Sequence, residues 1–465
     1  MKKMKIFAWT ILLAAGLTAC TDWLTVQPKT EVSKDDMFKS SGGFRDALIG
    51  VYTLMRENNY APNGNLVTGM VEFIANLWYT ESNSESGDFA AHNYRGDAVE
   101  RANGELFLQQ YKTITNLNQM LAYMENGVLS SREYALYKGE ALGLRAYLHF
   151  DLIRLYGPMP MNVQEGRRYL PYETTISLGN YTYSTYNEYM GALIADLDSA
   201  EILLARVDPI ITTSNSVLNT TNEYRQNRMN YYAVSGILAR AYLYNNQPNE
   251  AYKIAKEIID SQNNTKYYNF TSASKMTKGN LKFYDDILCG FYSTKLTDWD
   301  KALNDVLDAD GNQLFMEVKE VDNLFNGETD DYRKRYQLSA VNRLMKYAYQ
   351  NNATSEGILS SNLIPIIRMS EIYYIAAEAC FDKDPSEAID YLMQVKKGRN
   401  LRNVDLSGIT LKSDFMDRLI SDARREFLGE GQIFFMFKRL NQSVPTVNNW
   451  KSENFVLDVP DSENI

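Results

Sequence analysis

Histidine and cysteine are scarce in this sequence. Its 465 residues include two histidines, His92 and His149, and three cysteines, Cys20, Cys289 and Cys380. Two histidines leave little room for histidine-based metal sites or for catalytic triads that depend on histidine. Three cysteines are too few for a disulfide scaffold, although Cys289 and Cys380 can pair in an oxidising compartment. The motifs G-x-S-x-G, H-E-x-x-H and the P-loop are also missing, so we expect no enzyme and no cofactor.

Acidic residues outnumber basic ones. The chain has 58 Asp and Glu against 48 Lys and Arg, a formal net charge of −10. A chain this acidic is repelled by nucleic acid and by anionic lipid headgroups, so we do not expect nucleic acid as a partner. Beyond residue 20, no apolar run reaches the roughly 20 residues that a membrane-spanning helix needs. We therefore expect residues 41–465 to form one domain that lies outside the bilayer.

The first twenty residues have the pattern of a secretory signal that ends in a lipid-attachment site. A basic head at residues 2–5 precedes an apolar run at residues 6–17, which is too short to span a bilayer. Residues 17–20 read Leu-Thr-Ala-Cys and resemble the bacterial lipobox, whose cysteine takes a diacylglycerol. We expect residues 1–19 to be removed and a lipid on Cys20, with palmitate among its acyl chains, to anchor the protein to a membrane. The alternative is an ordinary cleaved signal with an incidental cysteine.

Helical periodicity covers most of the remaining chain and fails in two long segments. Residues 20–40 are polar and are expected to be the lipidated N-terminus and a tether. Residues 58–98 and 263–364 lose the helical period, and irregular segments this long are usually functional. Apolar residues recur at helical spacing in the following ranges: 44–56, 101–126, 131–156, 185–205, 227–245, 248–261, 367–381, 385–398, 413–428 and 432–440.

Two of these helical stretches resemble each other. Residues 238–255 and 375–392 each place a small residue, Ala239 or Ala376, before a proline-marked turn. Each has a second alanine twelve positions further on. The spacing resembles tetratricopeptide helix pairs, in which small residues let two helices approach closely. The alternative is two unrelated helical hairpins.

The order of the segments resembles a known family. Residues 139–160 read GEALGLRAYLHFDLIRLYGPMP and are similar to the E-x-x-x-L-R-A…Y-G-x-x-P block of the SusD/RagB family. Further blocks at 185–204, 228–259, 364–379 and 424–440 follow in family order. The last block departs from the family, because Gln432-Ile433 and Phe435-Met436 stand where an Arg and an Asp are usual. We expect this departure to affect local packing or a docking surface.

The resemblance implies a cell-surface nutrient-binding lipoprotein of Bacteroidetes. It implies a mainly α-helical SusD-like fold with tetratricopeptide-like pairs as scaffold and irregular segments as the ligand face. The implied partner is a SusC-like TonB-dependent transporter of the outer membrane, and the implied ligand is an oligosaccharide. Capture of peptides or protein fragments, as in the RagB branch, is the second reading. A purely structural helical-repeat lipoprotein is the third.

Aromatic residues on the two irregular segments are the ligand-binding candidates. Sugars present flat C–H faces that stack on Trp and Tyr, while amides and acids take their hydroxyls. Family members that bind starch take their ligand aromatics from these two regions. The competing interpretation is that such aromatics pin long loops to the helices. The candidates are Asn76, Trp78, Tyr79, Asn83 and Tyr94 in the first segment and Tyr292 and Trp299 in the second.

Other polar residues are expected to be structural. His149 lies between apolar neighbours on a helix and is expected to be hydrogen-bonded in the core. Arg145 and Asp151 on the same helix are expected to form ion pairs. The acidic stretch 328–331 is expected to be a solvated loop. A structural calcium site there has little support, because the stretch does not have EF-hand spacing.

Overall fold

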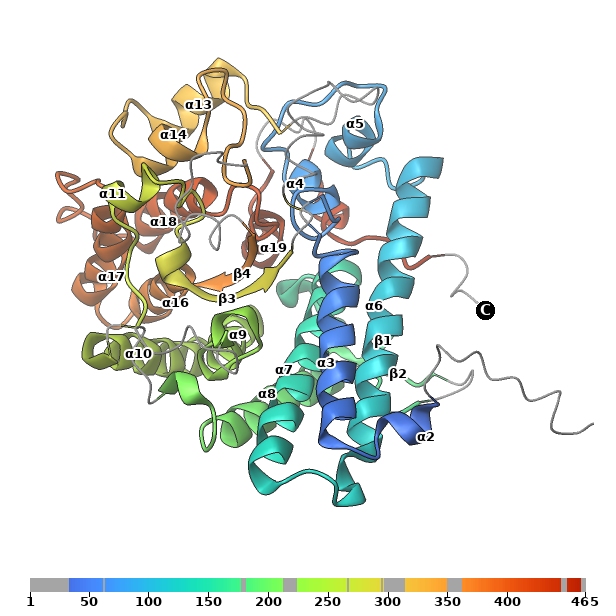
Figure 1. Ribbon diagram of the computed structural model, residues 1–465. Helices are drawn as coiled ribbons and strands as arrows, with labels where there is room; N and C mark the ends of the chain where they lie inside the picture. The colour runs from blue at the N-terminus through green and yellow to red at the C-terminus, as the bar shows by residue number, and fades with distance from the viewer. Residues whose placement is uncertain are drawn as a thin grey trace, which may run out of the picture.

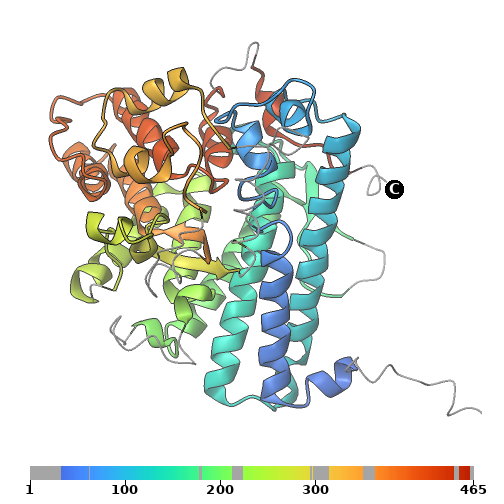
Figure 2. The same ribbon diagram turned by 45° about the horizontal axis from the view of Figure 1, so that its top comes forward.

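A computed structural model describes residues 33–61, 63–176, 181–211, 224–265, 267–293, 296, 314–348, 362–444 and 450–460. Long helices dominate it. α3 (Ser41–Arg56), α6 (Asp97–Tyr123) and α7 (Ser131–Tyr156) lie side by side as a bundle along one side of the molecule (Figures 1 and 2). α6 continues into a 3₁₀ turn, η1 (Met124–Asn126), at its lower end in Figure 1.

The sequence explains where α7 begins and ends. The Ser130 side chain accepts a hydrogen bond from the Glu133 amide, and the Glu133 carboxylate accepts one from the Ser130 amide, which forms a capping box. Gly157 follows the last turn, and Pro158 cannot continue the helix. The helix is buried from Gly139 to Tyr156, because it runs through the middle of the molecule.

Antiparallel helix pairs cover the other side of the bundle. α8 (Tyr186–Leu204) packs on α7, and α9 (Tyr231–Tyr244) packs on α10 (Pro248–Thr265). α10 in turn packs on α16 (Met369–Cys380), which pairs with α17 (Pro385–Gly398). The alanines of the predicted repeat, Ala239, Ala251, Ala376 and Ala388, are all fully buried. The mainly helical fold with tetratricopeptide-like pairs is thus confirmed.

A network of buried charges joins the last helices to the second irregular segment. Glu426, at the end of α18 (Lys412–Glu426), contacts the guanidinium groups of Arg333 (3.2 Å), Arg368 (2.5 Å) and Arg399 (2.5 Å). All four side chains are at most 1% exposed. Burial alone would raise the pKa of Glu426, but Arg399 and Arg368 hold it well below its usual range.

The two irregular segments contain more regular structure than the sequence predicts. The first contains α4 (Met70–Ile74) and α5 (Glu85–Ala90). The second contains α11 (Ala273–Met276), α13 (Val318–Phe325) and α14 (Tyr332–Gln337). It also contains β3 (Ile287–Tyr292), which pairs antiparallel with β4 (Leu363–Arg368). These strands could not be recognised from hydrophobic periodicity. Both are buried on both faces, so polar and apolar residues do not alternate along them.

The remaining elements are short. β1 (Arg168–Pro171) and β2 (Tyr183–Thr185) form a second antiparallel pair. α19 (Ile433–Leu440) packs against α4. The 3₁₀ turns are η2 (Pro160–Asn162), η3 (Pro209–Ile211), η4 (Arg225–Asn227), η5 (Tyr284–Asp286) and η6 (Ser452–Phe455).

The segment expected to be a tether is partly helical. α2 (Lys34–Met37) begins after Ser33, whose hydroxyl accepts a hydrogen bond from the Asp36 amide. The Phe38 ring then stacks on Tyr123 of α6, with the ring centroids 4.8 Å apart. Residues 33–40 are therefore fixed to the lower end of the bundle. Cys20 and the rest of the expected tether lie outside the described residues.

Several smaller expectations can be compared with the structure. His149 is hydrogen-bonded to the Tyr189 hydroxyl (2.9 Å) and to the carbonyl of Glu173 (3.2 Å), as predicted. Burial lowers its pKa to about 3, so it is neutral at physiological pH.

The two residues expected to form ion pairs both do so. Arg145 pairs with Asp196 at 2.7 Å. Asp151 pairs with Arg154 of its own helix.

Cys289 and Cys380 are both buried free thiols, so they do not pair with each other. Within the described part of the chain, none of the helices combines the length and apolar character needed to cross a membrane.

Candidate functional site

The two irregular segments meet at the upper end of the molecule in Figure 1. The Tyr79 amide donates a hydrogen bond of 2.9 Å to the carbonyl of Phe315, and the two rings lie 4.9 Å apart between centroids. Phe315 forms an antiparallel bridge with Arg343, and the Met316 amide donates to the carbonyl of Asn342 at 3.1 Å. These backbone contacts bring residues 79, 315–318 and 341–343 together. We call the surface formed by Tyr79, Phe315, Val318 and Val341 the Tyr79 face.

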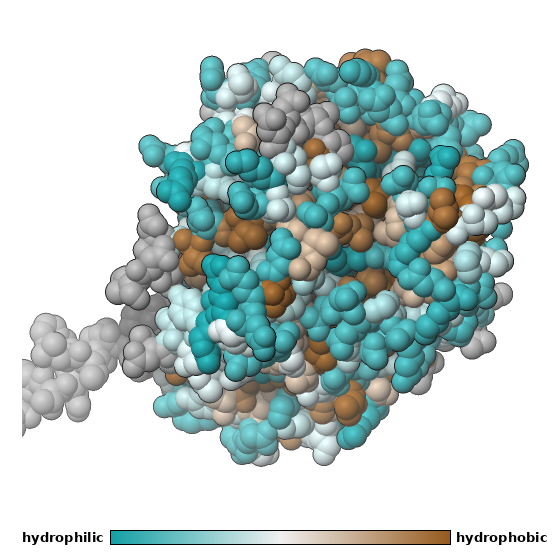
Figure 3. Space-filling model, turned by 180° about the vertical axis from the view of Figure 1, so that it is seen from behind, coloured by the Kyte–Doolittle hydropathy of each residue, from teal (hydrophilic) through white to brown (hydrophobic). Residues whose placement is uncertain are grey.

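The side chains of the Tyr79 face are unusually exposed for apolar residues. Tyr79 is 39% exposed, Val318 is 69% exposed and Val341 is 70% exposed. By contrast, Figure 3 shows that hydrophobic residues on the rear of the molecule are scattered among hydrophilic ones. An exposed aromatic ring that packs against Phe315 offers a flat apolar platform to a ligand.

Trp78 lies inside the protein, although it is the neighbour of Tyr79. It is 4% exposed, and its indole N–H donates a 2.7 Å hydrogen bond to the carboxylate of Glu72. Glu72 also accepts hydrogen bonds from the amides of Gly431 (2.7 Å) and Gly429 (3.0 Å). Burial raises the pKa of Glu72 to about 7, and these donors limit the rise. Trp78 therefore fixes the loop that presents Tyr79, and its ring does not face solvent.

The two asparagine candidates sit in turns on either side of Tyr79. Asn76 is half-buried, follows α4 and has a left-handed backbone with φ of 51°. Asn83 is exposed and comes just before Ser84, whose hydroxyl caps α5. Asn83 is therefore available to a ligand near Tyr79, whereas Asn76 ends a helix.

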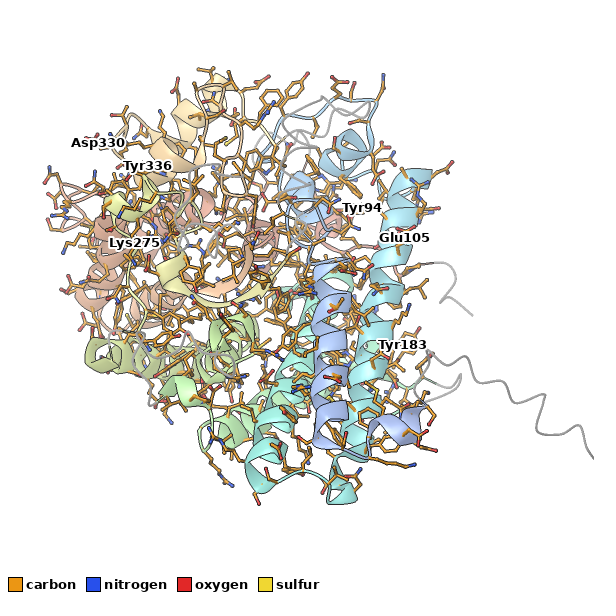
Figure 4. All side chains as sticks on the ribbon, viewed as in Figure 1. Tyr94, Glu105, Tyr183, Lys275, Asp330 and Tyr336 are labelled. Atoms are coloured by element: carbon orange, nitrogen blue, oxygen red, sulfur yellow. The ribbon has the colours of Figure 1, made fainter. Side chains whose placement is uncertain are left out.

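Tyr94 belongs to a different contact. Its hydroxyl donates a 2.6 Å hydrogen bond to the carbonyl of Asn454 near the C-terminus. Burial raises its pKa far above the usual value. Figure 4 places Tyr94 beside the upper end of α6. Its hydroxyl ties the first irregular segment to the C-terminal segment, so the structure does not bring it to the Tyr79 face.

Tyr292 ends strand β3. It is half-buried, its carbonyl accepts a 3.0 Å hydrogen bond from Arg56, and its hydroxyl accepts one of 3.2 Å from Asn362. The strand pairing thus fixes Tyr292 between α3 and β4. Trp299 lies outside the described residues, and its role stays a prediction.

Sequence reasoning missed Phe315, Val318 and Val341. All three lie in a long segment that lacks helical periodicity. Tyr79 was selected as an aromatic residue in such a segment, and Phe315 fits the same criterion. What it could not supply is the pairing of residues 315 and 343, which depends on the tertiary fold.

The acidic stretch 328–331 is not a solvated loop throughout, because arginines hold two of its carboxylates. Asp331 is fully buried and pairs with Arg333 at 2.7 Å. Glu328 pairs with Arg425. Among the described residues, there is no group of three or more histidine, cysteine or acidic side chains arranged to hold a metal ion.

Comparisons with known proteins agree with one another. A family model described as "SusD family" matches residues 210–459. A second, described as "Starch-binding associating with outer membrane", matches residues 22–243. A SusD-like protein from Formosa agariphila is 22% identical over 96% of this chain and 93% of its own.

Solved structures share the fold across nearly the whole chain. A SusD superfamily protein from Bacteroides vulgatus has a TM-score of 0.71 at 20% identity, over 91% of this chain and 96% of its own. A protein titled "Laminarin binding SusD-like protein" has a TM-score of 0.68 at 14% identity, over 91% of this chain and 97% of its own. At such identities the likeness establishes the fold.

Proposed function

The chain belongs to the SusD family, and on that basis we propose that it is a cell-surface lipoprotein that captures an oligosaccharide and delivers it to a SusC-like TonB-dependent transporter in the outer membrane. It acts by binding, without catalysis and without a cofactor. The observation that supports this proposal best is the exposed ring of Tyr79, held by Phe315 where the two irregular segments meet.

The geometry suits a sugar ring. The Phe315 contact fixes the Tyr79 ring before any ligand arrives, so little side-chain freedom is lost when a sugar stacks on it. The hydroxyl of Tyr79 supplies a polar partner at the edge of the platform, and the amide of exposed Asn83 is a further polar group in the same segment. Related proteins support the ligand class, because one family description names starch and one similar structure is titled as laminarin-binding.

The N-terminus supports the proposed location. Removal of residues 1–19 leaves Cys20 as the first residue, and lipid on it holds the protein at the outer membrane, facing outward. One family description, which covers residues 22–243, also names association with the outer membrane. The described chain starts at Ser33 at the lower end of the bundle, which is the end opposite the Tyr79 face (Figure 1).

A peptide ligand is the second candidate. Val318 and Val341 are about 70% exposed and belong to the two segments whose backbones pair next to Phe315, the contact of Tyr79. Aliphatic groups at this position fit the apolar side chains of a peptide as well as they fit a sugar face. Binding measurements against both ligand classes separate the two candidates.

The test is a titration of purified residues 21–465 against panels of neutral glycans and peptides. Replacing Tyr79 by Ala removes the platform and should weaken binding of the recognised glycan about tenfold, which corresponds to about 1.4 kcal/mol. Tyr181→Ala is the matched control, because Tyr181 is 49% exposed and lies two residues from Tyr183, which Figure 4 shows beside the lower half of α6. Saturable binding of peptides with no binding of any glycan would refute the proposal.

A further inference from the structure

A large groove opens at the end of the bundle opposite the Tyr79 face. Its volume is about 1390 Å³. η1 and the first three turns of α7 line one side of the groove. The residues after α8 line the other side, and η4 with its flanking residues closes the groove. Ligand pockets for small molecules usually occupy about 300 to 1,000 Å³, so this groove has room for several linked units.

The inner wall of the groove is electrically balanced. Arg225 pairs with Asp208 at 2.8 Å and also with Glu140, and all three side chains are at most 4% exposed. Tyr52 donates a further hydrogen bond to Glu140 at 2.9 Å. Arg225 carries one positive charge against two carboxylates, and Arg228, 3.9 Å from Glu140, supplies the second positive charge that balances this wall.

The two other acids that line the groove are also occupied. Glu133 accepts hydrogen bonds from Ser41 (2.6 Å) and from the Ser130 amide (3.1 Å). Glu125 binds the ammonium group of Lys138 at 2.9 Å. Both carboxylates thus have partners at the edge of the groove.

The outer wall carries arginines whose charge is less well matched. Arg132 and Arg206 line the groove, are exposed and form no ion pair with any described residue. Arg228 is 30% exposed, and its charge offsets the second carboxylate of the inner wall. Arg132 and Arg206 thus leave two guanidinium charges against one lining carboxylate, Glu133, whose hydrogen-bond donors are neutral, so the groove attracts anions locally. Guanidinium groups bind carboxylate and sulfate through paired hydrogen bonds.

Tyrosine rings line the groove together with these arginines. Tyr134, Tyr137 and Tyr224 line the same groove, and Tyr224 is 45% exposed. Rings and guanidinium groups together match a ligand that alternates flat C–H faces with anionic groups. A membrane surface fits the site poorly because it is flat and the groove is concave. The rings also favour a saccharide over an acidic peptide, whose charges lie on flexible side chains.

We propose that this groove is a second binding site, which takes an anionic oligosaccharide whose carboxylate or sulfate groups are held by Arg132 and Arg206 and whose rings pack on the tyrosines. The site is separate from the Tyr79 face and does not depend on the function proposed for that face.

The experiment uses the full mature chain purified in detergent. The probes are a galacturonate hexamer, a dextran sulfate oligosaccharide of similar length and neutral maltohexaose. The first two probes distinguish carboxylate from sulfate. We expect at least one anionic probe to bind, and its affinity should fall at least tenfold between 50 and 500 mM salt, because salt screens guanidinium charges. Arg132→Ala combined with Arg206→Ala should weaken it tenfold or more at low salt.

Matched variants keep the test specific. Arg402→Ala combined with Arg418→Ala removes two other exposed arginines outside the groove and should leave anion binding unchanged. Arg132→Ala combined with Arg206→Ala should leave binding of a neutral glycan at the Tyr79 face unchanged, which separates the two sites. Three results would overturn the proposal: no binding of either anionic probe, an equal loss in the two double variants, or a loss of maltohexaose binding in the Arg132 and Arg206 variant as large as its loss of anion binding. Binding of poly-glutamate or anionic vesicles in place of the saccharides would assign the groove to a peptide or to a membrane instead.

Discussion

Glu72 shows how one buried carboxylate can hold the loop that carries Tyr79. It accepts hydrogen bonds from Trp78 in the first irregular segment and from Gly429 and Gly431 in the turn before α19. Segments more than 350 positions apart in the sequence are thus joined through one side chain. Tyr79 follows Trp78 directly, so the position of the exposed ring depends on a residue that does not face solvent.

The pH dependence of stability tests this arrangement. Burial raises the pKa of Glu72 from 4.5 in the unfolded chain to about 7 in the folded one. Between these values the folded state binds a proton that the unfolded state releases. Glu72 therefore stabilises the fold below pH 4.5, and this stabilisation is lost as the pH rises to about 7.

The comparison that isolates this effect is with Glu72→Gln, which cannot titrate. The free energy of unfolding of the wild type, minus that of the variant, should fall by about 2 to 3 kcal/mol between pH 5 and pH 8. Urea unfolding at several pH values measures it, and contributions from other titrating groups cancel in the difference. A difference that does not change with pH would mean that the N–H donors offset the effect of burial on the pKa of Glu72.

At the scale of elements, the turn between α18 and α19 packs closely against the first irregular segment. Gly431 has a φ of +68°, and a Cβ added there would lie 2.3 Å from the carbonyl oxygen of Leu66. The backbone of this turn therefore approaches the segment before α4 more closely than a side chain allows.

Replacing Gly431 by Ala tests that close approach. Gly327 provides the matched control, because its φ is +78° but a Cβ there would meet nothing within 4 Å. Gly327→Ala should cost about 1 kcal/mol, the usual strain of a left-handed alanine. Gly431→Ala carries the same strain plus the clash with Leu66 and should cost at least about 2 kcal/mol more. Chemical denaturation measures both, and equal losses would show that the turn adapts freely.

Helices with strong local signals could be predicted from the sequence. The ranges 131–156 and 385–398 agree with α7 and α17 at both ends, because a capping box, a proline and a following glycine mark their boundaries. Strands β3 and β4 could not be predicted. They are buried on both faces, so no alternation of polar and apolar residues marks them, and the two strands are separated by about 70 residues of sequence.

The candidate site shows the same limit. An aromatic residue in an irregular segment can be exposed, as Tyr79 is, or buried, as Trp78 is. The difference depends on whether an acceptor such as Glu72 lies within reach of the indole nitrogen, which only the tertiary fold decides. The composition likewise gives a net charge but does not show that arginines gather in one groove.

At the scale of the whole molecule, the proposed anchor makes a prediction about location. Cys20→Ala should remove lipid attachment, so that the chain is no longer recovered with the outer membrane and does not incorporate labelled palmitate. Cys380→Ala is the control, because Cys380 is a buried free thiol in α16 and should leave location and labelling unchanged. Palmitate labelling of Cys20→Ala would place the lipid elsewhere.

The bundle of α3, α6 and α7 is long enough to turn a small rotation at one end into a large displacement at the other. α6 alone has 27 residues, which gives a length of about 40 Å at 1.5 Å per residue. Its lower end is fixed to α2 through Phe38 and Tyr123, and its upper end lies beside the segment that carries Tyr79 (Figure 2). A pivot of about 10° at the lower end therefore swings the upper end through about 7 Å, given that helix length. With the anchor proposed at Cys20, a slight rocking of the protein would become a ligand-sized displacement at the Tyr79 face.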